Sequence, residues 1–322
     1  MQDTANETQR LRKPMLTVDE QIAHLKAKGV TFDLCSEDEA ADYLGCANNY
    51  LRAASYRALY PKQVEGANVG CYINLDFSHL VNLASIDRHL REALLAAAVD
   101  VEHFAKVAVL NRASAEHEDG YAIVGDYLAS ISHDARRRIS SGFKARGGTD
   151  GRRDTYSGDL IEHYLEDCPV WVLFEICELG TFVDFYQFCA ERWNDRDMLD
   201  GHYILKSVKA VRNASAHNCC IVNGIASAGE AKGFPISEPI TNALNAAGMK
   251  NSKTRRKKLG NLRIAQISAL LYATKAFCST DAALARNAER FQQAKLRMRG
   301  KLAPVSGEQR HRVVFRFHYE AN

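Results

Sequence analysis

The chain has 322 residues, of which 46% are apolar and 25% are charged, and its net charge is only +3. These values are typical of a soluble globular protein with one large domain or two of ordinary size. Its six prolines and 20 glycines are few for this length and disfavour a loop-rich or all-β architecture. The N-terminus is polar, unlike a secretory signal peptide, and no stretch approaches 18 uncharged apolar residues. We therefore expect a cytoplasmic protein without membrane spans.

Nine cysteines are scattered along the chain, and no pair of them has CxxC spacing. The odd number and irregular spacing indicate buried free thiols in a reducing compartment rather than a disulfide framework or a zinc ribbon. A zinc site formed by His217, Cys219 and Cys220 is an alternative, but adjacent cysteines rarely ligate the same ion. We therefore expect neither a metal ion nor another cofactor.

Two capping boxes predict helices in the N-terminal region, which we place at residues 1–69. Thr17 and Glu20 can satisfy each other's backbone N–H groups, and Gly29 is suited to the position just after the helix that they begin. Ser36 and Glu39 repeat the same pattern for a second helix. A segment rich in tyrosine and arginine follows and runs to a proline at position 61.

The central region, residues 70–225, reads as a helical core. Apolar residues recur at helical spacing over residues 80–110 and predict one long helix or two continuous ones. Residues 142–151 are basic and glycine-rich and are interpreted as a flexible loop. The apolar run 171–188 predicts a buried helix that Gly180 interrupts, with a kink or a close helix contact there, and residues 203–211 predict an amphipathic helix.

The C-terminal region, residues 226–322, is interpreted as a helical extension. Residues 224–248 resemble a connection with one short helix, and residues 254–277 predict a single amphipathic helix with a basic first turn. Cations in the first turn oppose the helix dipole, so these charges would serve a partner instead. Residues 313–319 alternate with period two and predict a strand. The overall expectation is an all-α protein with little sheet.

Two segments concentrate positive charge. Residues 136–153 contain seven Lys or Arg and one acid, and residues 250–263 contain seven Lys or Arg and no acid. Both clusters suit the phosphate backbone of a nucleic acid, although either can also be a solvated helix face.

The motif that carries chemistry is Arg212-Asn213-Ala214-Ser215-Ala216-His217. Arginine binds phosphate through a planar fork of donors, and histidine exchanges protons near neutral pH. Together they supply what RNA cleavage at a 2′-hydroxyl requires. In a helix Asn213 and His217 share a face, whereas Arg212 lies apart, so convergence needs an irregular helix or two facing copies. In the alternative reading Arg212 pairs with a carboxylate, Asn213 caps a helix and His217 fills a polar niche in the core.

Five blocks of residues strengthen the functional interpretation of this motif. They are Lys13-Pro14-Met15-Leu16-Thr17 with Glu20, Gln21, Ile22, Leu25 and Gly29; Asn49-Tyr50-Leu51-Arg52 with Tyr56; Asp87-Arg88-His89-Leu90-Arg91 with Glu102; Pro169, Trp171, Glu175, Gly180 and Tyr186; and Arg212-Asn213 with Ala216, His217 and Asn223. In this order they resemble the signature of the abortive-infection AbiD/AbiF family over about residues 13–225.

The resemblance implies a helical bundle of the HEPN type, a role in phage defence and metal-independent ribonuclease chemistry. Arg212 and His217 would be the catalytic pair, Asn213 would orient one of them, and two copies would face each other in a homodimer. The resemblance also implies a structured noncoding RNA as a partner, in addition to RNA as the substrate. The alternative is a catalytically silent scaffold that binds RNA; a buried His217 would favour it, and an accessible one would favour the nuclease.

The chain departs from the family pattern directly after the motif. Asn218 stands where a second His is common, and Cys220 and Val222 stand where Arg and Trp are common. The missing Arg implies either a degraded catalytic activity, or weaker phosphate binding for which other cations compensate. The candidates are Lys206, Lys209, Arg255, Arg256, Lys257 and Lys258.

Overall fold

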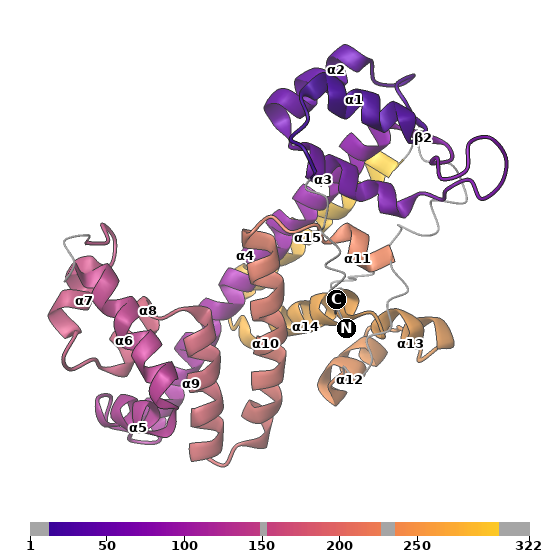
Figure 1. Ribbon diagram of the computed structural model, residues 1–322. Helices are drawn as coiled ribbons and strands as arrows, with labels where there is room; N and C mark the ends of the chain where they lie inside the picture. Colours follow the sequence, from indigo (N-terminus) through magenta and orange to yellow (C-terminus); the bar gives the residue numbers. More distant parts are fainter. Residues whose placement is uncertain (1–12, 149–152, 227–235, 303–322) are drawn as a thin grey trace, which may run out of the picture. The chain divides into compact units, whose positions relative to one another are not determined.

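The computed structural model describes residues 13–148, 153–226 and 236–302, and it confirms the all-α class (Figure 1). In this part of the chain the only paired strands are β1 (Val30–Thr31) and β2 (Leu75–Asp76), which run parallel. The chain separates into two compact units, and the boundary between Ile86 and Asp87 falls inside helix α4 (Phe77–Ala115). None of the described helices is long and apolar enough to cross a membrane.

The first unit is built from short helices. They are α1 (Val18–Ala27), α2 (Glu37–Asp42), the π-helical turn η1 (Tyr43–Ala47), α3 (Tyr50–Ser55) and the 3-10 turn η2 (Tyr56–Leu59). Both predicted capping boxes are present, at Thr17 with Glu20 and at Ser36 with Glu39. Gly29 follows α1 with φ at 79°, and a Cβ there would lie 2.8 Å from the Cβ of Cys71. Both the positive φ at position 29 and the close approach of Cys71 require glycine there.

The second unit begins in α4 and contains the remaining helices. They are α5 (Ala122–Ser130), α6 (His133–Gly147), α7 (Gly158–Tyr164), α8 (Val170–Ile176), α9 (Leu179–Arg192), α10 (Arg196–Ala216), α11 (Val222–Ala226), α12 (Glu238–Ala246), α13 (Lys253–Leu259), α14 (Leu262–Phe277) and α15 (Asp281–Leu302). The prediction of a continuous helix over residues 80–110 is confirmed, because α4 runs unbroken through them.

Helix α10 packs between α9 and α14 in the core of the second unit (Figure 1). Beside it, the rings of Phe174, Phe182 and Phe185 meet edge to face at 5.1–5.2 Å. His202 on α10 is buried, and its Nδ1 lies 3.1 Å from the carbonyl oxygen of Val183 on α9. The contact between His202 and Val183 thus joins α10 to α9.

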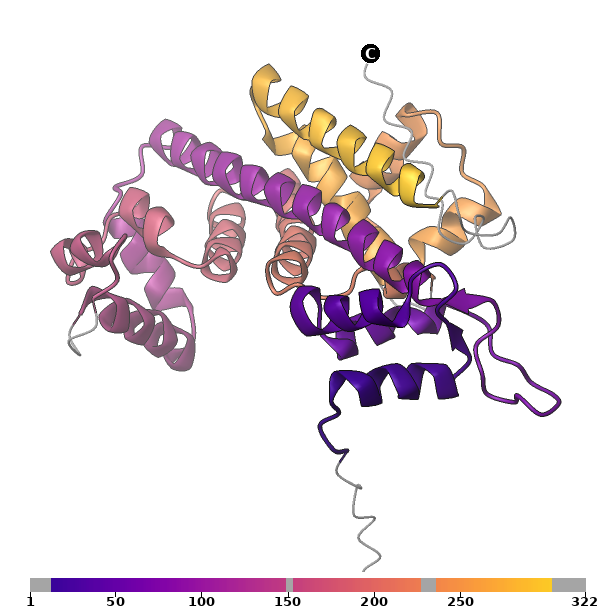
Figure 2. The same ribbon diagram turned by 90° about the horizontal axis from the view of Figure 1, so that it is seen from above.

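Helix α15 lies along α4 (Figure 2). The carboxylate of Asp100 on α4 accepts hydrogen bonds from Asn287 Nδ2 at 2.9 Å and Arg290 Nη1 at 2.8 Å. Asn287 is almost completely buried, so this polar contact lies inside the helix interface rather than at its edge.

Two predicted segments of the central region were wrong in detail. Residues 142–147 are the last turns of α6 and not a loop, and the helix ends at Gly148 in the left-handed conformation. The apolar run 171–188 is two helices, α8 and α9, because the backbone of Cys177 is extended. The break therefore precedes Gly180, which lies in the first turn of α9. Trp171 is also 49% exposed rather than buried.

The predicted helix over residues 254–277 is also two helices, α13 and α14, which meet at Gly260 and Asn261. The Asn261 side chain accepts hydrogen bonds from the backbone N–H groups of Arg263 and Ile264 and so begins α14. The basic residues consequently occupy the last turn of α13, where the helix dipole favours cations. The predicted strand over residues 313–319 lies outside the described residues.

All nine cysteines are free thiols, but only three of them are buried: Cys177, Cys189 and Cys278. Burial raises the pKa of Cys177 and of Cys189 to about 12, which keeps both thiols protonated. Cys46 and Cys219 are exposed, so the expectation of uniformly buried thiols was wrong for them.

Candidate active site at the end of helix α10

The ends of α10 are fixed by local hydrogen bonds. At its start, the Asp195 carboxylate accepts from the backbone N–H of Met198. At its end, His217 is the C-cap and Asn218 adopts a positive φ of 55°. The N–H of Asn218 donates to Ser215 O and that of Cys219 donates to Ala214 O, at 3.2 and 2.8 Å. This is a Schellman motif, and asparagine is one of the few residues that tolerates its left-handed position.

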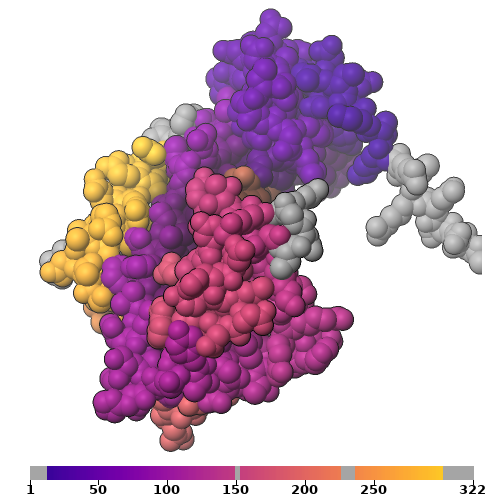
Figure 3. Space-filling view, turned by 90° about the vertical axis from the view of Figure 1, so that its left-hand side faces the viewer, coloured from indigo at the N-terminus to yellow at the C-terminus, as the bar shows by residue number. Residues whose placement is uncertain are grey.

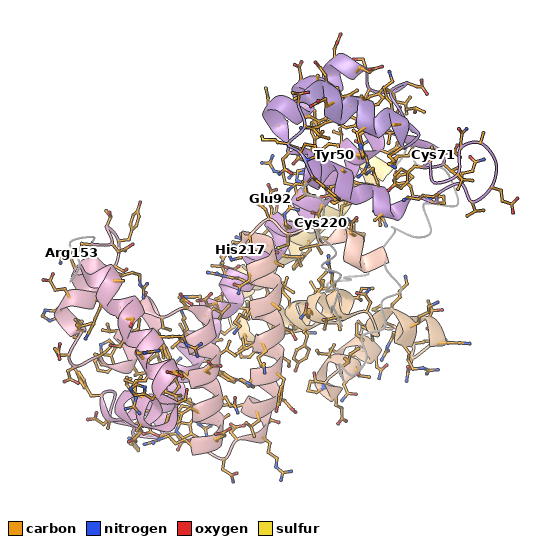
Figure 4. The ribbon with its side chains drawn as sticks, viewed as in Figure 1. Tyr50, Cys71, Glu92, Arg153, His217 and Cys220 are labelled. Carbon is orange, nitrogen blue, oxygen red and sulfur yellow. The ribbon has the colours of Figure 1, made fainter. Side chains whose placement is uncertain are left out.

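The three motif residues lie in the last two turns of α10. His217 is exposed, at the end of the helix in Figure 4, whereas Arg212 and Asn213 are half-buried. The N–H of His217 donates to Asn213 O at 2.9 Å, so the helix is regular up to His217. In a regular helix a five-residue spacing separates Arg212 from His217 by about 140° around the axis. Because the helix is regular here, its geometry keeps the side chains of Arg212 and His217 apart within one copy of the protein.

Asn213 contacts Arg212 directly. Arg212 Nη1 donates to Asn213 Oδ1 at 3.3 Å, while Arg212 Nε is buried and has no hydrogen-bond partner among the described residues. Within the same part of the chain no ion pair involves Arg212. The alternative reading of the motif fits poorly, because no carboxylate among the described residues pairs with Arg212, Asn213 is not the cap of a described helix, and His217 is exposed.

One side of α10 presents a row of polar and aromatic side chains that ends at His217. Tyr203, Lys206, Lys209, Asn213 and His217 are spaced by three or four residues and so lie within an arc of about 120°. Tyr203 is 61% exposed, and Lys206 Nζ lies 5.9 Å from the centre of its ring. We call this row the α10 track. Sequence reasoning found both lysines but missed Tyr203, which their helical spacing could have indicated.

The segment directly after His217 is held by two distant helices. Asp87 on α4 accepts hydrogen bonds from the N–H groups of Ile221 and Val222, both at 2.9 Å, and it forms a buried ion pair with Arg91. Arg263 on α14 donates to the carbonyl oxygens of Cys220 and Ile221. Cys220 stands where the family pattern commonly has Arg. The guanidinium group of Arg263 on α14 lies beside the backbone of Cys220.

Sequence reasoning gave no role to these three residues. Asp87 and Arg91 entered only as members of a block that carries the family resemblance, and they stand as opposite charges four residues apart on a predicted helix. Arg263 carried no signal of its own, because it was counted as one more cation of a basic cluster.

The predicted RNA contacts in α13 differ in exposure. Arg255 is only 8% exposed, and its Nη1 donates to Asn245 Oδ1 at 2.7 Å and to Met249 O. Its guanidinium group is therefore part of the fold. Arg256, Lys257 and Lys258 are exposed on the same helix.

Helix α6 carries most of the basic cluster at residues 136–153 and has no buried side chain. Four of its cations are exposed: Arg136, Arg137, Arg138 and Lys144. Figure 3 shows α6 and α7, in magenta and pink, at the surface. Farther along, Arg153 forms ion pairs with Asp159 and Glu162, which reduces its availability to a partner.

The zinc alternative at His217, Cys219 and Cys220 finds no support in the described residues. No group of three or more His, Cys, Asp or Glu side chains gathers there in a way that could hold a metal ion.

The second unit thus defines an all-α protein in which an Arg-Asn-His motif ends a central helix. A family model described as Abi-like protein matches residues 46–223, which is more than half of the chain and includes the motif. The chain belongs to this Abi-like family. Comparison with curated proteins and with solved structures gave no match.

Proposed function

We propose that this Abi-like protein acts in abortive infection, a form of phage defence, as a metal-independent endoribonuclease of the HEPN type. Family membership supports the defence role. The observation that carries the enzymatic proposal is the exposed His217 at the end of the α10 track, with Arg212 hydrogen-bonded to Asn213 on the preceding turn of the same helix. A residue that transfers protons must reach its substrate, and a histidine in a core niche does not.

The proposed reaction is an intramolecular attack of the RNA 2′-hydroxyl oxygen on the adjacent phosphorus. A new bond joins the 2′-oxygen to phosphorus, and the bond from phosphorus to the 5′-oxygen breaks. His217 takes the proton of the attacking hydroxyl or gives one to the leaving oxygen, and water exchanges the other. Arg212 stabilises the additional negative charge on the phosphorane, and Asn213 orients Arg212. The products are a 2′,3′-cyclic phosphate and a 5′-hydroxyl.

We propose a homodimer for the active form. Because α10 is regular up to His217, Arg212 and His217 of one copy point in different directions. Two copies related by a two-fold axis can place Arg212 of one protomer and His217 of its partner on one phosphate. The site would then be complete only in the dimer.

The α10 track favours single-stranded RNA as the substrate. From Tyr203 to His217 it extends about 21 Å, enough for several nucleotides. Lysines along a helix suit the phosphates of one strand, and an exposed aromatic ring suits a base that is not paired in a duplex. The proposed contacts are Lys206, Lys209, Arg256, Lys257 and Lys258, and Arg255 is removed from the set because it is buried.

A catalytically silent RNA-binding scaffold, in complex with a structured noncoding RNA, is the second candidate. The exposed cations of α6 favour it, because they can hold RNA whether or not His217 reacts. Both candidates share an RNA partner and differ only in cleavage.

The deciding experiment is cleavage of a labelled single-stranded RNA in EDTA. We expect the wild type to release fragments with 2′,3′-cyclic phosphate ends, and Arg212→Ala and His217→Ala to lose this activity while still binding RNA. His163→Ala, another exposed histidine in the second unit, is the matched control and should cut at the wild-type rate. Binding without cleavage by the wild type would select the scaffold, and cleavage that stops in EDTA would exclude the proposed mechanism.

A further inference from the structure

The four residues from Cys219 to Val222 lead from the motif into the first residue of α11, and every one of them is held through its backbone by a side chain of α4 or α14. We propose that Asp87, Arg91 and Arg263 form a clamp on this segment that positions His217 for catalysis. The inference rests on the proposed nuclease function and assigns positioning residues to the same site.

The α4 half of the clamp is a buried charge network. Asp87 is completely buried and Arg91 is 7% exposed. One carboxylate oxygen of Asp87 accepts both N–H groups of the segment, and the other pairs with Arg91, whose Nη1 also lies 3.5 Å from Cys219 O. A buried ion pair contributes little net stability compared with apolar side chains of the same size. Its directional bonds, in contrast, fix where the segment lies.

The α14 half approaches from the other side. Arg263 Nη1 donates to Cys220 O and, at 3.0 Å, to Ile221 O. Asn261 Nδ2 donates to Gly224 O at 2.6 Å. A Cβ at Gly224 would overlap the Arg263 guanidinium group, so the chain can pass this close to Arg263 only because position 224 is glycine. Arg263 is itself exposed, in contrast to the Asp87–Arg91 pair.

The clamp reaches His217 through the helix cap. Cys219 is the residue whose N–H closes the Schellman motif on Ala214, and its carbonyl faces Arg91. Holding Cys219 and its successors therefore fixes the backbone angles of His217 and Asn218, and with them the direction of the imidazole. Catalysis tolerates only small errors in such a direction, since a misplacement of about 1 Å can cost about 100-fold in rate.

Variants of Arg263 test the inference most directly, because the residue is exposed and its loss leaves no buried charge. Arg263→Met removes both hydrogen bonds, and Arg263→Lys keeps the charge but loses the planar fork. We expect kcat to fall about 10- to 100-fold for Arg263→Met and less for Arg263→Lys, with KM for RNA changed by less than about 3-fold. Arg88→Gln on α4 is the control, since Arg88 is exposed and its ion pair within the described residues is with Glu92.

The double variant Asp87→Asn with Arg91→Gln tests the α4 half. It removes both charges together and keeps an oxygen acceptor for the two N–H groups. We expect the same fall in kcat in protein whose circular dichroism matches the wild type. If the double variant does not fold, the Arg263 variants decide alone.

A second readout does not depend on cleavage. In protein with 13C-labelled histidine, the His217 ring resonance should shift or broaden in the clamp variants and stay unchanged in Arg88→Gln. Folded clamp variants with wild-type kcat and a wild-type His217 resonance would overturn the inference. If the wild type cuts no RNA, the nuclease proposal fails, while the resonance still decides whether the clamp positions His217.

Discussion

The side chain of Tyr203 stands 14 residues before His217 on the same side of α10, with Lys206 against its ring. An exposed tyrosine next to a cation offers a flat surface on which one unpaired base can stack. Stacking on an aromatic side chain contributes about 1–3 kcal/mol per base. We therefore expect the ring to contribute to RNA affinity separately from the chemistry proposed at His217.

Replacing Tyr203 by alanine should weaken binding of single-stranded RNA by about 5- to 100-fold, the equivalent of one stacked base. Tyr203→Phe keeps the ring and should bind within about 2-fold of the wild type. The control is Tyr156→Ala, because Tyr156 is 98% exposed on a different part of the second unit. Fluorescence anisotropy at constant salt measures all three, and equal affinity for Tyr203→Ala and the wild type would contradict stacking.

His202 connects the stability of α10 to pH. Burial lowers its pKa from the usual 6.5, and Lys206 acts in the same direction, while the Val183 carbonyl and two carboxylates oppose them. Because the unfolded chain binds the proton more readily, the free energy of unfolding should decrease as pH falls below about 6.5. Above that pH the neutral imidazole is favoured in both states, and this contribution to the pH dependence vanishes.

The variant His202→Asn retains a donor at the position of Nδ1 but does not titrate. Urea unfolding from pH 7.5 to 5 should show a smaller loss of stability for this variant than for the wild type. His163→Ala, which removes an exposed histidine, should keep the wild-type slope. Identical slopes for His202→Asn and the wild type would exclude His202 as the source.

At the scale of the helix, local signals predicted beginnings better than ends. Thr17 and Ser36 were correct starts because a capping box is contained in four residues. The break between α13 and α14 was missed because apolar residues keep their helical period across Gly260 and Asn261. The break between α8 and α9 was missed for the same reason, and there Gly180 was mistaken for the interruption.

The residues of the candidate site also differ in whether the sequence could identify them. Arg212, Asn213 and His217 lie within six consecutive positions, so a short sequence motif could identify them. Asp87, Arg91 and Arg263 act on backbone atoms up to 135 residues away. Backbone N–H and carbonyl groups occur along the whole chain, so a side chain that binds them does not indicate in the sequence which segment it contacts. Asp87 and Arg91 were part of a family block, but only the packing of α4 and α14 around the end of α10 reveals what they bind.

Helix α13 concentrates exposed cations in its last turn, and this arrangement predicts a salt-dependent interaction. Neutralising Arg256, Lys257 and Lys258 to glutamine should weaken RNA binding and lower the slope of log K against log salt by about 2, if each contacts one phosphate of a single strand. Arg255 stays unchanged because it supports the fold. A filter-binding series at several salt concentrations gives the slope.

The control removes three exposed cations elsewhere in the second unit, namely Lys275, Arg286 and Arg299. It changes the net charge by the same amount, so a general electrostatic effect would appear in both proteins. An equal decrease in slope for the two triple variants would show that α13 is no specific contact.

For the whole molecule, the proposed composite site predicts complementation. Arg212→Ala and His217→Ala should each be inactive, whereas a mixture of the two should recover part of the wild-type activity. Each heterodimer contains one intact Arg212 and one intact His217 on opposite protomers, which together rebuild one site. Cleavage assays after mixing and subunit exchange measure the recovery, with size-exclusion chromatography to verify the dimer.

Mixing either variant with itself is the control and should recover nothing. A mixture that forms heterodimers but stays inactive would contradict the shared site. So would a monomeric wild type that cuts RNA at the full rate.

We expect that the region matched by the family model does not fold on its own. The family match ends at residue 223, yet α14, which packs on α10 and carries Arg263, begins about 40 residues later. A fragment ending at the match would expose the side of α10 that packs on α14 and release the connection that follows His217. Expression of residues 46–223 should therefore give an aggregating product, and a minimal active fragment has to extend through Phe277.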